Sequence, residues 1–368
     1  MDGIVVLGAG YAGVMAANRL AAQGEDVTVV TPQPWLVERI RLHRVASGLR
    51  DDARAPLAEL LHPDVRVVED TATRIDAAND AVELASGTVL PYGCLVYAVG
   101  SGVRDAALPA SVHVVTDEAG ALRLRGALAA RPEATVRVIG AGLTGIELAS
   151  VLAGSGRRVH VVTTSSLTAT PSERAHARHL RGQGVVLETG RRATRDDAPD
   201  DEITVDTTGF HVPSLAADSG LPTDADGRLL VGADLAVDGI PNVFGAGDAA
   251  RVDDPSGAHL RMACATALPM GAHAADAIRA RAAGNPAPAF SLGYVLRCVD
   301  LGRADARAQH VTAEDEDRSF AVGGVAGGMI KEAICRMTLQ WIRNERQRPG
   351  RFRWADGPRL AAEPVAVR

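Results

Sequence analysis

Apolar residues near the start of the chain form two short runs that flank an alanine-rich segment. The first run, "IVVLG", starts at Ile4, and the second, "VTVV", starts at Val27. Short β-branched runs of this kind favour buried strands, and the alanine-rich segment that ends at Gly24 favours a helix. The pattern therefore predicts a strand–helix–strand unit at this end of the sequence.

The same pattern occurs a second time in the middle of the chain. "VRVIG" starts at Val136, and "VHVV" follows after a second helical segment. Between strand and helix, both copies carry glycines with the spacing GxGxxG: Gly8, Gly10 and Gly13, and Gly140, Gly142 and Gly145. In a βαβ unit the first glycine allows a tight turn, the second lets the backbone approach a pyrophosphate, and the third lets the helix pack closely. The repeat predicts two dinucleotide-binding domains.

Length, composition and charge narrow the class of protein further. The chain has 368 residues, an apolar fraction of 46% and a net charge of −6. This length predicts more than one domain, and the negative charge gives no general attraction to nucleic acid. No apolar run approaches the roughly 18 residues of a membrane-spanning helix, and a strand at Ile4 leaves no room for a signal peptide. We therefore expect a cytoplasmic protein.

The cysteines are few and scattered. Cys94, Cys264, Cys298 and Cys335 form no CxxC motif and no close pair. This spacing favours a reducing compartment and predicts neither a disulfide framework nor a metal site.

Four further stretches carry a family resemblance: "RIRLHRVASG" (39–48), "CLVYAVGS" (94–101), "IPNVFGAGDAA" (240–250) and "ACATALPMGAHAADAIRA" (263–280). With the two glycine motifs, they resemble the two-dinucleotide-binding flavoproteins, the superfamily of pyridine nucleotide–disulfide oxidoreductases. Within it, the chain is most similar to type II NADH dehydrogenases and apoptosis-inducing-factor-like oxidoreductases. The resemblance runs from Met1 to about Phe290 and weakens afterwards.

The resemblance implies an α/β fold with two Rossmann-like domains, the second inserted in the first. A discontinuous FAD-binding domain would cover residues 1–105 and 230–290, and a shortened NAD(P)H-binding-like domain would cover residues 106–229. A C-terminal α+β region would cover residues 291–368.

The resemblance also implies how FAD is held. Asp248 would bind the ribityl chain, a helix from about Thr266 would point its positive end at the flavin pyrimidine, and Arg39 could reach the phosphates. Further cofactor-binding positions are expected at Ala12, Ala72, Ala98 and Gly100.

Three features depart from the family pattern. The acidic residue that usually binds the ribose hydroxyls is replaced by Thr31 in the first copy and Thr163 in the second. The second domain is short, as if a hairpin near the nucleotide had been removed. No cysteine lies between Gly10 and Cys94, so a redox disulfide is missing and electrons would pass directly to an external acceptor.

Two side chains are candidates for catalysis. Glu147 is expected in the first turn of the second nucleotide helix, and in resembling enzymes this glutamate faces the cleft between flavin and nicotinamide. The alternative is a charge that only favours the helix dipole. His43 lies in the segment expected over the flavin and could relay a proton. The alternative is a structural, hydrogen-bonded histidine.

A basic amphipathic helix is predicted near the C-terminal end. Ile330, Ile334, Met337 and Trp341 fall on one helical face, and residues 329–359 contain eight basic and three acidic side chains. Such a helix could attach the protein to an anionic membrane surface. The alternative, which we favour, is that the apolar face packs on the FAD domain or on a second subunit in a homodimer.

Three functions remain open, and the first fits the most observations. It is an FAD-dependent oxidoreductase that passes a hydride from NAD(P)H to a quinone-like or other small acceptor. The second is a flavoenzyme that has lost nicotinamide use and binds its organic substrate in the vacated cleft. The third is a redox-sensing flavoprotein.

Overall fold

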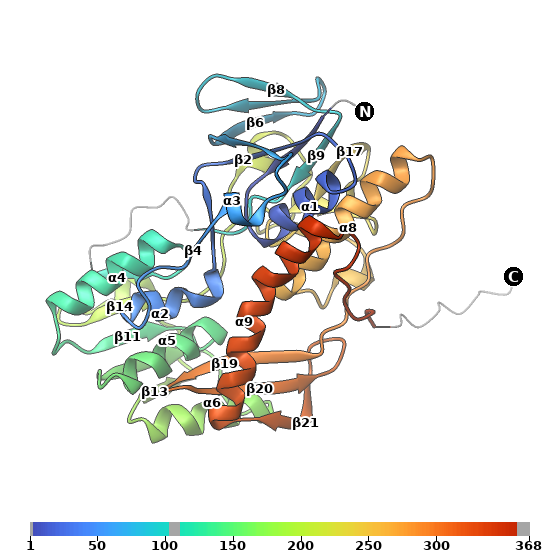
Figure 1. The fold of residues 1–368 in the computed structure, drawn as a ribbon. Coiled ribbons are helices and arrows are strands. Elements are labelled where there is room, and N and C mark those ends of the chain that lie inside the picture. Colours follow the sequence, from blue (N-terminus) through green and yellow to red (C-terminus); the bar gives the residue numbers. More distant parts are fainter. Residues whose placement is uncertain (1–2, 103–110, 359–368) are drawn as a thin grey trace, which may run out of the picture.

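The computed structural model describes residues 3–102 and 111–358. Figure 1 shows two α/β units, one above the other, and a C-terminal region in which one long helix runs along both. Each unit is built around its own mainly parallel sheet. The predicted fold class, with two Rossmann-like units, is therefore confirmed.

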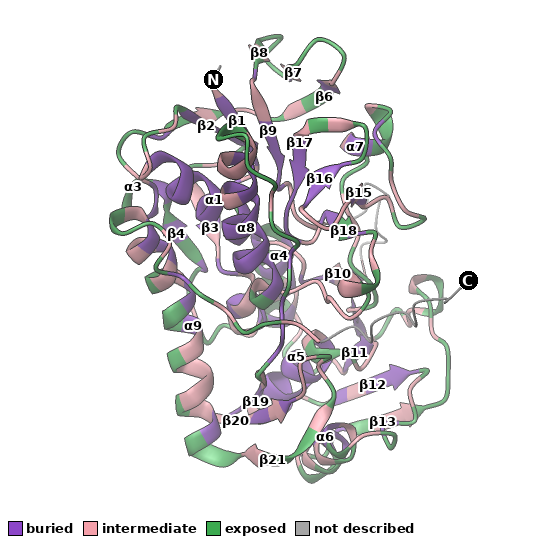
Figure 2. Cartoon of the chain, turned by 90° about the vertical axis from the view of Figure 1, so that its right-hand side faces the viewer, coloured by how far each residue is buried: buried purple, intermediate pink, exposed green. Residues whose placement is uncertain are grey.

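The first unit contains a six-stranded sheet in the order β16-β17-β9-β1-β2-β5. Its strands are β1 (Ile4–Leu7), β2 (Val27–Thr31), β5 (Arg66–Glu69), β9 (Cys94–Tyr97), β16 (Ala236–Val237) and β17 (Ile240–Gly245). Only the edge strand β16 runs antiparallel to its neighbour. The buried helices α1 (Tyr11–Ala21) and α8 (Cys264–Ala282) pack on this sheet and on each other (Figure 2).

Smaller elements complete the first unit. An antiparallel sheet of β6 (Ala72–Asp76), β7 (Ala81–Leu84) and β8 (Val89–Pro91) adds side chains to the same core. The short elements α7 (Leu215–Asp218), β15 (Leu229–Val231), β18 (Ala250–Val252) and η3 (Pro255–Gly257) lie along the returning chain. Ala216 and Leu221 already belong to the first core, although they precede residue 230.

The second unit contains a five-stranded sheet in the order β10-β14-β11-β12-β13, and every strand pair in it is parallel. Its strands are β10 (Val112–Val114), β11 (Val136–Ile139), β12 (Val159–Thr163), β13 (Val186–Thr189) and β14 (Ile203–Asp206). Its helices are α4 (Glu118–Ala130), α5 (Leu143–Gly154) and α6 (Pro171–Gly182). Only one short 3-10 turn, η2 (Arg195–Asp197), lies between β13 and β14.

A short excursion of the first unit reaches the second. The paired strands β3 (Trp35–Val37) and β4 (Arg54–Pro56) enclose η1 (Arg39–Arg41) and α2 (Leu42–Ala46), and α3 (Leu57–Leu60) follows. Helix α2 packs against α4 and α5, and its apolar side chains belong to the core of the second unit. The excursion therefore places His43 next to helix α5.

The C-terminal region joins both units. Strands β19 (Leu296–Gly302), β20 (Asp305–Val311) and β21 (Asp317–Val322) form an antiparallel sheet, and β19 packs against α5. Helix α9 (Gly324–Gln347) crosses β19 and β20 and continues to α1 and α3 (Figure 1).

Helix α9 buries only part of the apolar face that the sequence predicts, and Trp341 on that face packs against the core of the first unit. Met337 is 39% exposed, and Ile330 and Ile334 are only partly buried. The buried positions are instead Gly327, Cys335, Thr338, Ile342 and Glu345. A Cβ at Gly327 would lie 2.0 Å from the carbonyl oxygen of Ala306, so the helix approaches β20 through its glycines. Close backbone packing and buried ion pairs, rather than the apolar stripe, orient this helix.

Candidate active site

The first glycine loop combines tight internal packing with open space. Gly8 has φ +97°, and a Cβ there would lie 2.4 Å from the carbonyl oxygen of Ala98. A Cβ at Gly13 would lie 1.9 Å from the carbonyl oxygen of Gly8, whereas a Cβ at Gly10 would meet nothing within 4 Å. The first and third glycines thus close the turn, and the second faces free space at the N-terminus of α1. Because no side chain caps that helix, its first N–H groups are available to phosphate oxygens.

The second glycine loop has the same geometry. Gly140 has φ +99°, and a Cβ at Gly145 would lie 2.2 Å from the carbonyl oxygen of Gly140. A Cβ at Gly142 would meet nothing within 4 Å, and α5 also begins without a side-chain cap. The second loop therefore keeps a cradle that fits a pyrophosphate.

A polar group lies beyond the carboxyl ends of β9 and β17. Ser101 Oγ donates to Asp248 Oδ2 at 2.7 Å, and Arg39 Nη1 donates to Ser101 Oγ at 2.7 Å. The Arg39 Nη1 atom also lies 3.6 Å from Asp248 Oδ2. The Nη2 atom of Arg39 is buried and has no hydrogen-bond partner among the described residues. An unsatisfied guanidinium next to a carboxylate fits a ligand that carries phosphate and sugar hydroxyls, as FAD does.

Helix α8 begins at Cys264, slightly before the expected Thr266. Its first turn carries no side-chain cap, so its positive end is exposed to a ligand. The Thr266 hydroxyl is used within the protein, because Oγ1 donates to the Arg261 carbonyl oxygen at 2.7 Å and lies 2.7 Å from the Tyr294 hydroxyl.

The smaller predicted positions have different surroundings. A Cβ at Gly271 would lie 2.1 Å from the carbonyl oxygen of Ala12, so Ala12 is where α1 and α8 pack most closely. Ala98 follows β9, and Gly100 has φ +70°. Ala72 opens β6, next to the turn in which the Asp70 N–H donates to the Thr31 carbonyl oxygen at 3.0 Å. These positions therefore line the same end of the first sheet.

Both threonines that replace the usual acid are buried at the ends of their strands. Thr31 is 4% exposed and donates from Oγ1 to the Gln33 carbonyl oxygen at 3.3 Å. Thr163 Oγ1 accepts from the Ser165 N–H at 3.2 Å. The Arg191 N–H donates to the Thr163 carbonyl oxygen at 3.1 Å. An arginine that follows the carboxyl end of β13 therefore lies next to this position.

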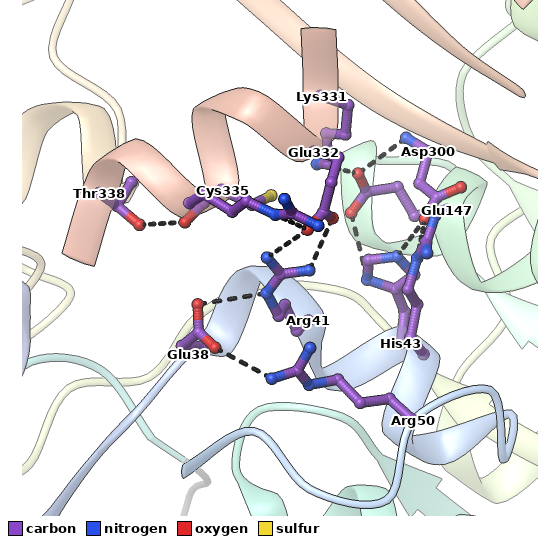
Figure 3. Close-up of polar contacts among 12 residues, drawn as sticks. Glu38, Arg41, His43, Arg50, Glu147, Asp300, Lys331, Glu332, Cys335 and Thr338 are labelled. Atoms are coloured by element: carbon purple, nitrogen blue, oxygen red, sulfur yellow. Dashed lines mark hydrogen bonds and ion pairs between the residues drawn. The ribbon is translucent and has the colours of Figure 1, made fainter. Parts of the chain in front are cut away.

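Glu147 and His43 meet in a buried charged cluster, which Figure 3 shows. Lys331 Nζ donates to Glu147 Oε1 at 2.7 Å, and the Asp300 N–H donates to the same oxygen at 3.0 Å. His43 Nδ1 lies 3.7 Å from Glu147 Oε2, and His43 Nε2 lies 2.9 Å from Asp300 Oδ2. The four side chains come from α5, α2, β19 and α9.

This cluster corrects the placement of Glu147. The structure puts Glu147 in the second turn of α5, with no acidic residue in the first turn. Burial acts to raise the pKa of Glu147, but the Lys331 ammonium and His43 outweigh it and lower that pKa below its usual value. Burial acts to lower the pKa of Lys331, but the Glu147 carboxylate raises it above its usual value. Glu147 and Lys331 therefore form an ion pair at neutral pH. A carboxylate that only interacted with the dipole of α5 would not need such a partner.

The nearby thiols are not activated. Burial raises the pKa of Cys264 and of Cys298 to about 11, so both are protonated at neutral pH. No disulfide joins the cysteines, and within residues 3–102 and 111–358 no group of His, Cys, Asp or Glu side chains could hold a metal ion.

The sequence alone does not identify three residues of the cluster: Asp300, Lys331 and Arg44. Arg44 Nε donates to Asp300 Oδ2 at 2.6 Å. Lys331 was counted with the basic face of a surface helix. The one available signal was Asp300 itself, an acidic residue inside the apolar strand "CVDLG".

Comparisons with known proteins identify the family of the chain. A family model described as "Pyridine nucleotide-disulphide oxidoreductase" matches residues 2–276. An NADH dehydrogenase-like protein of Mycobacterium tuberculosis is 30% identical over 91% of this chain and 93% of its own length. A type II NADH:quinone oxidoreductase of the same organism is 28% identical over 77% of this chain and 74% of its own length.

Solved structures show the same fold. The sulfide:quinone oxidoreductase from Aquifex aeolicus has a TM-score of 0.79 at 19% identity, covering 95% of this chain and 93% of that one. NDH2 from Plasmodium falciparum in complex with NADH has a TM-score of 0.76 at 12% identity, covering 95% of this chain and 99% of that one. The matched family model and the full-length relative together confirm the resemblance drawn from the motifs. The chain belongs to the pyridine nucleotide-disulphide oxidoreductase family, and it is a flavin- and NAD(H)-dependent oxidoreductase.

Proposed function

We propose that the chain is an FAD-dependent oxidoreductase that passes a hydride from NAD(P)H to a quinone-like or other small acceptor. The observation that carries this proposal is the second glycine loop, which keeps the open geometry of the first at Gly142. A cleft taken over by an organic substrate would not need a pyrophosphate cradle there. The alternative of a flavoenzyme without nicotinamide use is therefore less well supported.

FAD, rather than FMN, fits the first unit. The loop at Gly10 would hold the pyrophosphate, and Asp248, Ser101 and Arg39 would hold the phosphates and the ribityl hydroxyls. Bound FAD supplies a two-electron acceptor for the hydride. The residues of the chain bind it, orient it and exclude water around it.

The second nucleotide site gives little basis for choosing between NADH and NADPH. Thr163 offers a hydroxyl but no charge to the ribose. Arg191 lies next to it, but its Nη1 donates to Glu188 Oε1 at 2.6 Å, so a 2′-phosphate would have to compete with a carboxylate. We therefore propose weak discrimination between the two nucleotides.

We propose a quinone-like acceptor, because the cluster around Glu147 and His43 can handle protons and the reduction of a quinone needs protons as well as electrons. Reduction of a quinone by a hydride donor also takes up one proton from the solvent. Glu147 and His43 are titratable groups in a buried cluster, and Lys331 holds Glu147 in place. We propose that Glu147 and His43 relay this proton from the solvent to the acceptor.

We also propose that exposed side chains of β21 and of the first turns of α9 contact a membrane surface, where quinone-like acceptors dissolve. Phe320, Val325 and Met329 are 65%, 66% and 69% exposed, and Arg318 and Arg336 lie near them in sequence. In the described part of the chain, no helix is long and apolar enough to cross a bilayer. The protein should sediment with anionic vesicles, and Met329→Glu should weaken this; a homodimer that remains free of vesicles would contradict the proposal.

The proposed function is tested by anaerobic mixing of the purified flavoprotein with NADH or NADPH. Rapid bleaching of the flavin absorbance, and its recovery on addition of a soluble quinone, are the expected results. Failure of both nucleotides to bleach the flavin would instead support the enzyme without nicotinamide use.

A further inference from the structure

Asp300 is one of the most deeply buried acidic residues of the chain. It lies in β19 with no exposed surface; two groups donate to its carboxylate, and a histidine nitrogen lies within hydrogen-bond distance of it. Arg44 Nε donates to Oδ2 at 2.6 Å, the Gly302 N–H donates to Oδ1 at 2.9 Å, and His43 Nε2 lies 2.9 Å from Oδ2. This carboxylate therefore does more than neutralise one cation.

The position of Asp300 is fixed by the β19–β20 turn. Gly302 has φ +76°, and a Cβ there would lie 2.9 Å from the carbonyl oxygen of Ser150 in α5. The turn thus packs directly on the helix that carries Glu147. The Asp300 N–H also donates to Glu147 Oε1, and the two carboxylates lie near the two ring nitrogens of His43.

The ionisation of Asp300 decides which nitrogen of His43 carries the proton. Burial acts to raise the pKa of Asp300, but the hydrogen bonds from His43 and Arg44 lower it well below its usual value. An ionised carboxylate can only accept hydrogen bonds. In a neutral imidazole, the nitrogen that faces Asp300 must therefore be the one that bears hydrogen, which leaves Nδ1 with its lone pair towards Glu147.

We propose that Asp300 is a positioning residue that holds His43 in the Nε2–H tautomer, so that the bare Nδ1 can accept a solvent proton by way of Glu147 and release it when the acceptor is reduced. This inference rests on the proposed function. The overall reaction balances as NAD(P)H, one proton and a quinone giving NAD(P)⁺ and a hydroquinone. The hydride carries both electrons and one hydrogen, and the pair of Glu147 and His43 passes the solvent proton.

The charges around His43 suit this role. It faces Glu147 from α5 and Asp300 from β19, and Lys331 from α9 and Arg44 from α2 pair with those carboxylates. Two anions and two cations balance when His43 is neutral. The separation of 3.7 Å between Nδ1 and Glu147 Oε2 is too long for a hydrogen bond, so exchange requires Glu147 to move towards the ring.

The first test is the tautomer itself. Imidazole ¹⁵N NMR of the holoenzyme, with the His43 signals assigned by their loss in His43→Gln, should show hydrogen on Nε2 and a bare Nδ1. In Asp300→Asn the negative charge is lost and the amide can either accept from or donate to Nε2, so the preference for the Nε2–H tautomer should weaken. Hydrogen on Nδ1 in the wild type would overturn the proposal, and this readout does not depend on any activity.

The second test separates the two half-reactions. Asp300→Asn should leave flavin reduction by NADH within about twofold of wild type but slow quinone reduction at least tenfold, which corresponds to about 1.4 kcal/mol. Because the charge next to His43 is lost, the pH profile of quinone reduction should also change in this variant. An unchanged quinone rate and an unchanged pH profile in this variant would overturn the proposal.

A matched control comes from the same hairpin. Asp305 lies in β20, with its Oδ2 3.8 Å from His179 Nδ1, and Asp305→Asn should change neither half-reaction nor the His43 signals. A wild-type flavin that no nicotinamide nucleotide reduces would refute the proposed function. The NMR result would still decide the role of Asp300.

Discussion

The two glycine loops share one backbone geometry but differ in what covers them. In the first, Tyr11 at the start of α1 is 7% exposed, and α8 packs against Ala12. In the second, Leu143 at the start of α5 is 38% exposed. The same loop geometry is therefore followed by a buried side chain in the first copy and by an exposed one in the second. Under the proposed function, the more covered helix start suits a resident cofactor, and the more exposed one suits a nucleotide that binds and leaves.

A second difference lies in the side chains that accompany each loop. The first is accompanied by Arg39, Ser101 and Asp248, which can hold a whole dinucleotide. The second is accompanied by Thr163 and by Arg191, whose guanidinium is paired with Glu188. We propose that burial and charged partners, rather than the glycine motif, separate a resident site in the first unit from an exchanging site in the second.

The largest effect should be the loss of bound flavin when a side chain is introduced into the first glycine loop. A Cβ at Gly10 meets nothing within 4 Å in the protein, so Gly10→Val should fold, but the side chain would occupy the space of the pyrophosphate. We expect colourless protein, as measured by the ratio of flavin absorbance to protein absorbance. Gly126→Val, on exposed helix α4 with equally open space, is the control and should remain yellow.

The next largest effect is expected on the free energy of unfolding, at the ion pair that joins helix α9 to the second unit. Lys331→Met removes the cation that stabilises the Glu147 carboxylate in a buried position. Leaving one partner of a buried ion pair uncompensated typically costs about 3–5 kcal/mol, and urea unfolding at pH 7 measures it.

The double variant Glu147→Gln/Lys331→Met should recover most of that loss, because no buried charge is then left unpaired. The pKa of Glu147 is below its usual value in the wild type, so the contribution of the pair is present above the unfolded pKa and is lost as the pH falls through the folded pKa. A cost in Lys331→Met that the double variant does not recover would mean that packing, not charge, is lost.

The smallest effect concerns nucleotide choice. Since Thr163 carries no charge and Arg191 is engaged by Glu188, the kcat/KM values for NADH and NADPH should differ less than about tenfold, or about 1.4 kcal/mol. Steady-state kinetics with both nucleotides at one ionic strength measure the ratio. Thr163→Glu should shift it towards NADH, and a strong NADPH preference in the wild type would show that Arg191 leaves Glu188 to bind the phosphate.

The fold could be predicted because its signals are local. A strand, three glycines and a helix follow one another within each copy, and the positive φ of Gly8 and Gly140 lies where the spacing places it. Asp248 could be predicted as a site residue for the same reason, because it lies just after the end of strand β17.

The charged cluster could be predicted only in part. Glu147 and His43 were identified as candidates, but the partners that fix them are far apart in sequence. Lys331 is separated from Glu147 by 184 residues, and Asp300 is separated from His43 by 257. The buried face of α9 differs from the predicted apolar face for the same reason. It depends on Glu147 and on the backbone of β20 rather than on the periodicity of the helix itself.

Gly142→Val shows whether the second glycine loop receives a nicotinamide nucleotide. A side chain at Gly142 meets nothing in the protein, so the variant should fold and keep its full flavin content. Stopped-flow absorbance under anaerobic conditions should then show no flavin bleaching by NADH or NADPH, although the wild type is bleached rapidly. Bleaching of Gly142→Val at the wild-type rate would show that the nucleotide binds elsewhere and would contradict the account.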